Sequence, residues 1–275
     1  MVIAPQKGGE GHARPLSFPP VLRRRPLLAA LAAATLLAGC GADSEPGKDK
    51  AKASTSTGTQ TGTTATTSST ATRPAAPPAK PVCRKVAEPK AKDEPKLKAP
   101  TSRLDSDKLY RAVLTTSCGT FTITLDVRRA PKTAASFVSL SEQGFYDNTI
   151  FHRIVPGFVI QGGDPLGNGQ GGPGYSVVEA PPPELRYTRG VVAMAKTEIE
   201  EPGTSGSQFY VVTGPDAQLP PDYALVGRVS AGQDVVDLIG RSPTDSTNPD
   251  PARQEAPIKP VVIQRVTIEE ARAPK

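Results

Sequence analysis

Residues 151–165, with the sequence FHRIVPGFVIQGGDP, combine polar side chains that could do chemistry with large apolar ones. Arg153 and Gln161 are set in a strand-like stretch that is otherwise rich in Phe, Ile and Val. An arginine is always charged and holds its donors in a rigid fork, and a glutamine can both donate and accept. A pocket of this kind could bind proline.

Three other patterns indicate different chemistry, and we discount each of them. Gly203–Ser207 (GTSGS) is similar to the nucleophile loop of trypsin-like proteases, but His152 precedes it too closely for the two barrels and the aspartate of that fold. The run GNGQGG at 167–172 matches a dinucleotide fingerprint, yet Pro173 follows where a helix should begin, so we expect a loop bordering the active-site groove. No histidine or cysteine cluster has metal-ligand spacing, so we expect no metal.

The elements that must position these residues are mostly short strands. Residues 110–116 and 119–125 predict a hairpin with one buried face, and Pro131 begins a helix that should run to Gln143 and stop at Gly144. Many short strands with only two helices predict a closed or nearly closed antiparallel barrel capped by those helices. Further strands are expected at 150–155, 158–161, 190–195, 208–213, 225–229 and 261–268, and a second helix at 233–239.

Five motifs together resemble one family. FHRIVPGFVIQGGDP is followed by GNGQGGPGY, GVVAMA, GTSGSQFYVVT and YALVGRV. Their order and spacing resemble those of cyclophilin-type peptidyl-prolyl isomerases over roughly residues 108–270. The resemblance implies a mainly β fold, namely a closed eight-stranded antiparallel β-barrel capped by two α-helices. It also implies isomerase activity on proline-containing polypeptides, no cofactor, and a monomer.

The resemblance gives Arg153 the position of the family's catalytic arginine. Rotation about an X-Pro bond meets a barrier of ~20 kcal/mol because twisting the amide destroys its resonance. The twisted prolyl nitrogen gains a lone pair that can accept a hydrogen bond, and a charge-assisted hydrogen bond is worth about 1.5–3 kcal/mol. Arg153 would thus supply one or two powers of ten in rate, and a dry, preorganised pocket the rest. The alternative for Arg153 is a surface ion pair.

Other site residues are also implied by position. Gln161 should hold the carbonyl near the rotating bond, and the backbone of Lys196 should fix the substrate. Ala195 and Gln208 should line the neighbouring groove. For each apolar residue the alternative is ordinary barrel core. The walls that receive the proline ring should be Phe158, Val159, Tyr210, Leu219 and the aromatic ring of Tyr223.

The chain departs from the family pattern at several positions. Gln218 stands where many members carry a large aromatic that binds cyclosporin, which puts sensitivity to that inhibitor in doubt. Tyr223 replaces a common histidine and Tyr210 a common phenylalanine, so each wall keeps an aromatic ring and adds a hydroxyl. His152 lies next to Arg153, but neighbours on a strand point to opposite faces, so we expect a structural histidine with its hydrogen bonds satisfied.

A function from another class fits the same pocket. A proline-peptide binding module or holdase would keep the apolar walls and turn over poorly. Retention of Arg153 with Gln161 favours catalysis, because simple binding does not require a donor aimed at the prolyl nitrogen.

The first forty residues predict a lipoprotein signal peptide (residues 1–39). Arg23–Arg25 precede an apolar run at 27–38 that as a helix would span only ~18 Å, too short for a bilayer core of ~30 Å. The run closes with LAGC at 37–40, which resembles the bacterial lipobox, so we expect palmitate-type acyl chains on Cys40. The alternative is a leader cut elsewhere. Lipidation predicts a protein anchored on the extracytoplasmic side of the cell membrane.

Residues 40–100 predict a stalk, and residues 101–275 a single folded domain. Thr, Ser, Gly, Pro and Lys dominate 42–81, a composition that cannot offset its ordering entropy. The net charge of +6 also arises before residue 101, since 101–275 hold seventeen Lys and Arg against twenty Asp and Glu. A slightly acidic domain argues against nucleic acid as a partner.

Two cysteines remain besides Cys40. In an oxidising compartment Cys83 and Cys118 predict a disulfide that joins the end of the stalk to the first hairpin. The alternatives are two free thiols or a metal site, for which the sequence lacks a nearby second pair.

Overall fold

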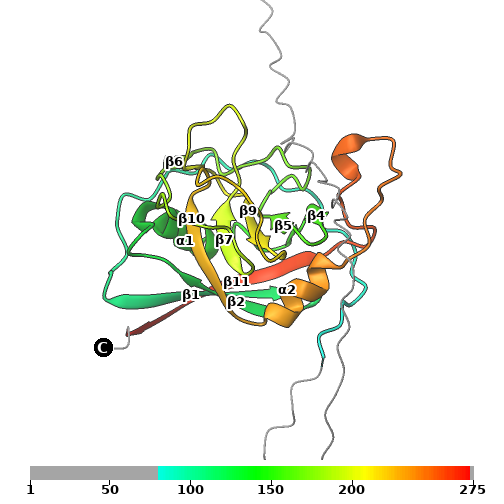
Figure 1. Ribbon diagram of the computed structural model, residues 1–275, viewed down its shortest axis with the longest axis horizontal. Coiled ribbons are helices and arrows are strands. Elements are labelled where there is room, and N and C mark those ends of the chain that lie inside the picture. The colour runs from blue at the N-terminus through cyan, green and yellow to red at the C-terminus, as the bar shows by residue number, and fades with distance from the viewer. Residues whose placement is uncertain (1–79, 273–275) are drawn as a thin grey trace, which may run out of the picture. The chain divides into compact units, whose positions relative to one another are not determined.

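The computed structural model describes residues 80–272. The predicted signal peptide, the lipidation of Cys40 and the predicted stalk before residue 80 lie outside these residues and stay predictions. Figure 1 shows the strands as one large curled sheet with two helices packed against it. The mainly β class and the two helices are therefore confirmed.

The elements follow the predicted order closely. The structure has two strands where one was expected at 150–155, and the ends of several other strands differ from the expected ones. The sequence pattern also missed β6 (Val177–Val178) and β8 (Thr204–Ser205), which have two residues each. In chain order the elements are β1 (Lys108–Thr116), β2 (Gly119–Leu125), α1 (Pro131–Glu142), β3 (Thr149–Ile150), β4 (Arg153–Val155), β5 (Val159–Gly162), β6 (Val177–Val178), β7 (Val191–Met194), β8 (Thr204–Ser205), β9 (Phe209–Val212), β10 (Leu225–Ala231), α2 (Gln233–Gly240), a 3-10 turn η1 (Pro251–Arg253) and β11 (Val262–Arg272).

The main sheet has nine strands in the order β3-β11-β1-β2-β10-β7-β9-β5-β4, and β6 pairs with β8 in a separate small sheet. All of these strand pairs are antiparallel. The predicted closed barrel of eight strands is wrong, because β3 and β4 at the two edges do not pair with each other. The sheet is an open, curled half-barrel.

The sheet stays open because the strand predicted at 150–155 is divided. Phe151 and His152 lie outside the strands, and the backbone N–H of Phe151 donates to Val261 rather than to a sheet neighbour of β4. The residues before this break pair with β11, and those after it pair with β5. One short stretch of chain thus supplies both edges. No continuous ladder joins them, and Ile150 of β3 forms an isolated bridge with Asp164, just after β5.

Helix α1 receives its N-terminal cap from outside the helix. Pro131 occupies the favoured first turn, and Ala130 has no side chain that could cap it. The carboxylate of Glu179 instead accepts the backbone N–H groups of Lys132 and Thr133, at 3.0 and 2.8 Å. Gly144, with φ +65°, follows the helix as predicted.

Alternation along the strands gives the sheet two differently packed faces. Phe209 on β9 faces the main core, where its ring lies 5.5–6.2 Å from the rings of Phe137, Tyr146 and Phe151. Tyr210, the next residue, belongs to a second cluster on the other face. We call the first the inner face and the second the outer face.

The chain before β1 is attached to the domain. The predicted disulfide between Cys83 and Cys118 is present, and it joins this segment to the turn between β1 and β2. Residues 80–100, which the composition placed in the stalk, are extended without helix or strand and donate backbone hydrogen bonds to the domain.

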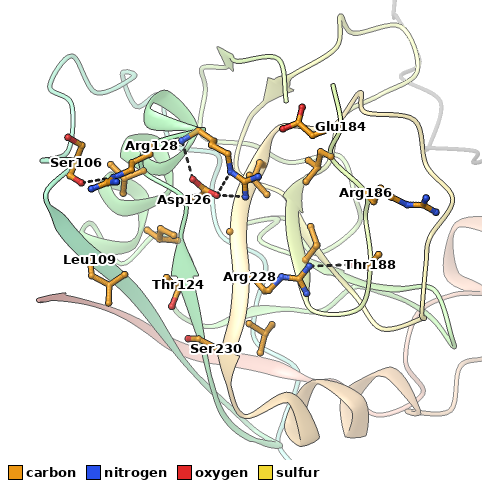
Figure 2. A pocket seen from close by; sticks show the side chains of 18 of the residues that line it. Ser106, Leu109, Thr124, Asp126, Arg128, Glu184, Arg186, Thr188, Arg228 and Ser230 are labelled. Carbon is orange, nitrogen blue, oxygen red and sulfur yellow. Dashed lines mark hydrogen bonds and ion pairs between the residues drawn. The ribbon is translucent and has the colours of Figure 1, made fainter. Parts of the chain in front are cut away.

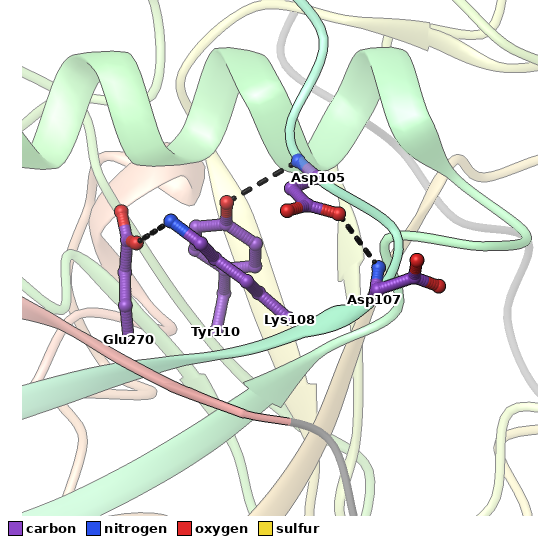
Figure 3. A network of polar contacts seen from close by, with 5 residues as sticks. All are labelled: Asp105, Asp107, Lys108, Tyr110 and Glu270. Atoms are coloured by element: carbon purple, nitrogen blue, oxygen red, sulfur yellow. Dashed lines mark hydrogen bonds and ion pairs between the residues drawn. The ribbon is translucent and has the colours of Figure 1, made fainter.

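Figure 3 shows how β1 begins. Asp105 accepts the N–H of Asp107 at 2.9 Å, and its own N–H donates to the hydroxyl of Tyr110 at 3.2 Å. Lys108 forms an exposed ion pair with Glu270 of β11 at 2.8 Å. These contacts fix the entry into β1 next to the last strand.

Candidate active site

The two polar residues singled out from the sequence lie in one row across the outer face. Arg153 of β4 is paired with Gln161 of β5, Gln161 with Tyr210 of β9, and Tyr210 with Ala193 of β7. Directly paired residues in antiparallel strands place their side chains on the same face, with Cβ atoms about 4.5–5.5 Å apart. Strand register therefore brings the guanidinium, the amide and an aromatic ring together.

Gln161 is buried and held by another glutamine. Its Nε2 donates to Oε1 of Gln208 at 3.0 Å, and Nε2 of Gln208 donates to the carbonyls of Gly169 and Gly171 at 2.9 and 3.0 Å. This chain of hydrogen bonds fixes the orientation of both amides.

Arg153 is largely withdrawn from solvent. Its side chain is 14% exposed, and its Nε donates to the carboxylate of Glu255 at 2.5 Å. Glu255 follows the 3-10 turn η1, and its backbone carbonyl accepts the N–H of Ile154 at 2.7 Å. Arg153 therefore does form an ion pair, which was the alternative interpretation of this residue. The pair lies beside the outer face and fixes the arginine at one edge of it.

The predicted walls gather on the same face. Val159 and Tyr210 are buried in the outer cluster, and Phe158, Leu219 and Tyr223 pack against it half-buried. The rings of Tyr210 and Tyr223 meet edge to face at 5.6 Å. The structure therefore brings together all five residues that the sequence assigned to the proline pocket.

The charge of Arg153 acts on this wall. Burial raises the pKa of Tyr223 to about 12, the carboxylates of Asp222 and Glu198 act in the same direction, and the positive charge of Arg153 opposes them. Arg153 thus lies within electrostatic reach of Tyr223. A cation beside apolar and aromatic walls is the arrangement expected for a twisted amide bound between them.

A groove beside the pocket is lined by Ala195 and Gln208, the two residues expected there, and also by Lys196. The backbone N–H of Ala195 donates to the carbonyl of Gln208 at 2.8 Å. The ammonium of Lys196 donates to the carbonyls of Thr197 and Glu200 and lies 5.6 Å from the ring centre of Tyr223. These contacts fix the side chain of Lys196 along the wall.

The glycine-rich run at 167–172 is a loop, and no helix follows it. It is organised by Asp164, which sequence reasoning missed: this buried carboxylate accepts the N–H groups of Leu166, Asn168 and Gly169 at 2.5–2.9 Å. A Cβ at Gly171 would lie only 2.2 Å from an oxygen of Asp164. An aspartate placed just before a glycine run was the feature of the sequence that could have indicated this role.

The serines of the GTSGS motif are structural. The hydroxyl of Ser207 is buried and donates to the carbonyl of Gly163 at 2.8 Å, and that of Ser205 donates to Val177 at 3.3 Å. Both hydroxyls thus donate to backbone carbonyls rather than to a histidine. The hydrolase interpretation gains no support from this geometry.

His152 is buried as expected, but its hydrogen bonds are not satisfied. Neither ring nitrogen has a hydrogen-bond partner among residues 80–272. Burial lowers the pKa of His152 to about 4, with Asp164 acting against the shift and Arg153 acting with it. The imidazole is therefore neutral near pH 7, and the prediction of a fully satisfied histidine is wrong.

A separate cavity of about 840 Å³, drawn in Figure 2, contains none of the predicted substrate-contacting residues. Its arginines already have partners within the chain. Arg128 donates to the carbonyl of Ser106, Arg228 donates to Arg189 and Thr188, and Arg129 pairs with Asp126. The charges of these arginines are therefore compensated within the chain.

No group of three or more His, Cys, Asp or Glu side chains within residues 80–272 could hold a metal ion. No helix within the same residues has the length and apolar character needed to cross a membrane.

Comparison with known families and sequences identifies related proteins. The family described as cyclophilin type peptidyl-prolyl cis-trans isomerase/CLD matches residues 111–268. Peptidyl-prolyl cis-trans isomerase B of Streptomyces anulatus is 42% identical over 182 residues, which is 60% of this chain and 98% of that protein. Peptidyl-prolyl cis-trans isomerase A of Mycobacterium tuberculosis is 37% identical over 175 residues, covering 57% of this chain and 91% of that protein.

Solved structures agree with the sequence matches. The crystal structure of a cyclophilin type peptidyl-prolyl cis-trans isomerase from Cryptosporidium parvum is similar with a TM-score of 0.53 and 32% identity, over 58% of this chain and 98% of that one. A second structure of that protein, determined in the presence of the dipeptide Ala-Pro, matches with a TM-score of 0.52.

Proposed function

The chain belongs to the cyclophilin-type peptidyl-prolyl cis-trans isomerase family, and we propose that its reaction takes place on the outer face, with Arg153 as the group that stabilises the twisted X-Pro amide. The observation that carries this assignment is the paired row of Arg153, Gln161 and Tyr210 beside an apolar aromatic cluster.

The proposed reaction needs no covalent step. The prolyl ring packs against Phe158, Val159, Tyr210, Leu219 and Tyr223, and this packing holds one side of the rotating bond. Gln161 holds the carbonyl on the other side. As the amide twists, its nitrogen becomes a better acceptor, and Arg153 donates to it. The interaction is stronger in the twisted state than in either planar isomer, which is the condition for catalysis.

The test is NMR exchange spectroscopy on an X-Pro peptide with wild-type protein and Arg153→Ala. Loss of one charge-assisted hydrogen bond should lower the exchange rate about ten- to a hundredfold. Arg153→Lys keeps the charge without the fork, and Arg228→Ala removes an arginine elsewhere as a control. Equal rates for wild type and Arg153→Ala would reject the assignment and support the binding module.

We also propose a lipoprotein form, anchored at Cys40 on the extracytoplasmic side, that assists the folding of secreted proteins as a monomer. The proposal is supported by the arginines, apolar run and LAGC sequence at 23–40 and by a disulfide that suits an oxidising compartment. Mass spectrometry of the mature N-terminus should find acyl chains on Cys40, and Cys40→Ala should release the protein from membranes. An unmodified N-terminus would reject the anchor.

A further inference from the structure

The segment before the family match is bound to the domain and lines a cavity. We call residues 92–97 the strap. At its start, the backbone N–H of Lys92 donates to the carbonyl of Pro165 at 2.9 Å. At its end, the backbone N–H of Leu97 donates to the carbonyl of Pro173 at 2.9 Å. The ammonium of Lys92 also donates to the carbonyl of Phe145 at 2.9 Å. Both ends of the strap are therefore bound to the domain.

The glycine-rich loop is shaped to accept the strap. Gly174 has φ +86°, and a Cβ there would lie 2.8 Å from the carbonyl oxygen of Pro95 and 2.9 Å from Cα of Lys96. The N–H of Gly172 donates to the carboxylate of Glu94 at 3.2 Å. A side chain at Gly174 would push the strap away, so the close contact depends on this glycine.

The strap and the domain together enclose a cavity of about 780 Å³. The strap lines this cavity through Glu94, Pro95 and Lys96, and the loop at 196–200 lines it through Lys196, Thr197 and Glu200. This volume is within the range of about 300–1,000 Å³ typical of sites that bury a small organic ligand. It is large enough for a short piece of polypeptide.

The cavity is continuous with the proposed site. Ala195, Lys196 and Gln208 line it, and Gln208 accepts the hydrogen bond from Gln161 in the catalytic row. Gln208 also donates to the loop carbonyls that form the floor. A polypeptide with its proline in the aromatic pocket would pass Gln208 and reach the strap.

The lining fits an uncharged chain better than an ionic ligand. Two carboxylates, of Glu94 and Glu200, balance two ammonium groups, of Lys96 and Lys196. The carboxylate of Glu200 already accepts from the N–H and hydroxyl of Thr197. Ile199, which lies in the chain between the lining residues Thr197 and Glu200, is 97% exposed and offers an apolar contact. Balanced charge and one apolar contact give no preference for a phosphate or a nucleic acid.

We propose that the strap extends the groove lined by Ala195 and Gln208, and that it adds contacts of its own to an uncharged stretch of the substrate flanking the X-Pro bond. This inference rests on the proposed function, because it takes the outer face as the place where the proline binds. It predicts that the chain before residue 111 contributes to substrate selection.

The test compares two peptides with the variant Glu94→Ala/Pro95→Ala/Lys96→Ala. The short peptide is Ala-Pro with blocked ends, and the long one extends it on both sides with uncharged residues. The variant should weaken binding of the long peptide about five- to tenfold in NMR titrations, since several contacts are lost, and leave the short peptide unchanged. Lys90→Ala/Lys98→Ala, also on this segment but outside the cavity, should change neither.

The substitutions are at half-exposed or exposed positions and leave the strap's backbone hydrogen bonds in place, and a thermal melt checks that the variant is folded. Equal weakening of both peptides, or of neither, would overturn the inference. The two proposals can also fail separately. If the strap variant weakens the long peptide alone, while wild-type protein and Arg153→Ala exchange the short peptide at the same rate, the proposed function is rejected and the role of the strap stands.

Discussion

The inner and outer faces of the sheet are built from the same strands but carry different chemistry. On β9, Phe209 and Val211 face a core of phenylalanine rings, while Tyr210 and Val212 face the cluster that contains the proposed site. The inner face contains apolar packing that stabilises the fold. The outer face combines buried aromatic rings with an arginine, a glutamine and hydroxyl groups. Stability and catalysis should therefore be separable by substitutions at adjacent positions.

The largest expected effect is a loss of stability from the inner face. Phe209→Ala removes a ring that contacts three others, and such a truncation costs about 3–5 kcal/mol of unfolding free energy. Urea denaturation measures this loss, and Phe209→Leu should lose less because most of the apolar volume stays. The exchange rate per folded molecule should change little. A tenfold drop in that rate with stability intact would contradict the division into two faces.

His152, at the break between β3 and β4, should make stability depend on pH. The unfolded chain binds a proton near pH 6.5, whereas the folded protein resists protonation until about pH 4. The unfolding free energy is therefore fully retained above pH 6.5 and falls by about 3 kcal/mol as the pH drops to 4. Denaturation curves across this range measure the slope. His152→Leu should remove most of it, and an unchanged slope in that variant would assign the effect to other groups.

A matched pair of tyrosines on the outer face should respond in opposite directions. The hydroxyl of Tyr210 is buried without a hydrogen-bond partner in the described part of the chain, so Tyr210→Phe should raise the unfolding free energy by about 1 kcal/mol. The hydroxyl of Tyr187 donates to the carbonyl of Tyr223 at 2.6 Å and accepts its N–H at 3.0 Å. Tyr187→Phe should therefore destabilise by about 1–2 kcal/mol. Thermal melts compare the two, and the same sign for both would show that hydrogen bonding does not decide the outcome.

The smallest effect should come from the group that holds Arg153. Glu255→Ala removes the carboxylate at Nε, so the guanidinium is less well oriented, and kcat should fall about three- to tenfold with KM nearly unchanged. Glu255→Gln keeps an acceptor and should recover part of the rate. Stability should change little because Glu255 is half exposed. A change in KM alone would argue that Glu255 acts on substrate binding instead.

Strand alternation and turn residues made much of the fold predictable. Phe121, Ile123 and Leu125 alternate with threonines, and this pattern predicted the hairpin that the structure contains. Pro131 and Gly144 likewise marked the limits of α1. The five predicted wall residues gather in one cluster because the family motifs fix their register.

The features that the sequence did not predict depend on contacts between distant segments. The break at Phe151 and His152 lies within an apolar run that has no local signal for an interruption. The strands β6 and β8 are too short for any pattern to appear. Glu255 lies more than a hundred residues from Arg153, so nothing local links the two.

The strap was missed for a different reason. Its sequence, KDEPKL, is mostly charged and shares Pro and Lys with the stalk before it, and composition measures only the ability to form a core. The strap needs no core of its own, because backbone hydrogen bonds and a disulfide hold it on one that already exists.

The bond between Cys83 and Cys118 also determines how tension would enter the domain. A pull on the chain upstream of Cys83 follows the shortest covalent path, which crosses the two sulfur atoms and reaches the turn between β1 and β2. Residues 84–117 form a closed loop beside that path. The wall at Glu94–Lys96 would therefore keep its shape while the tether is stretched.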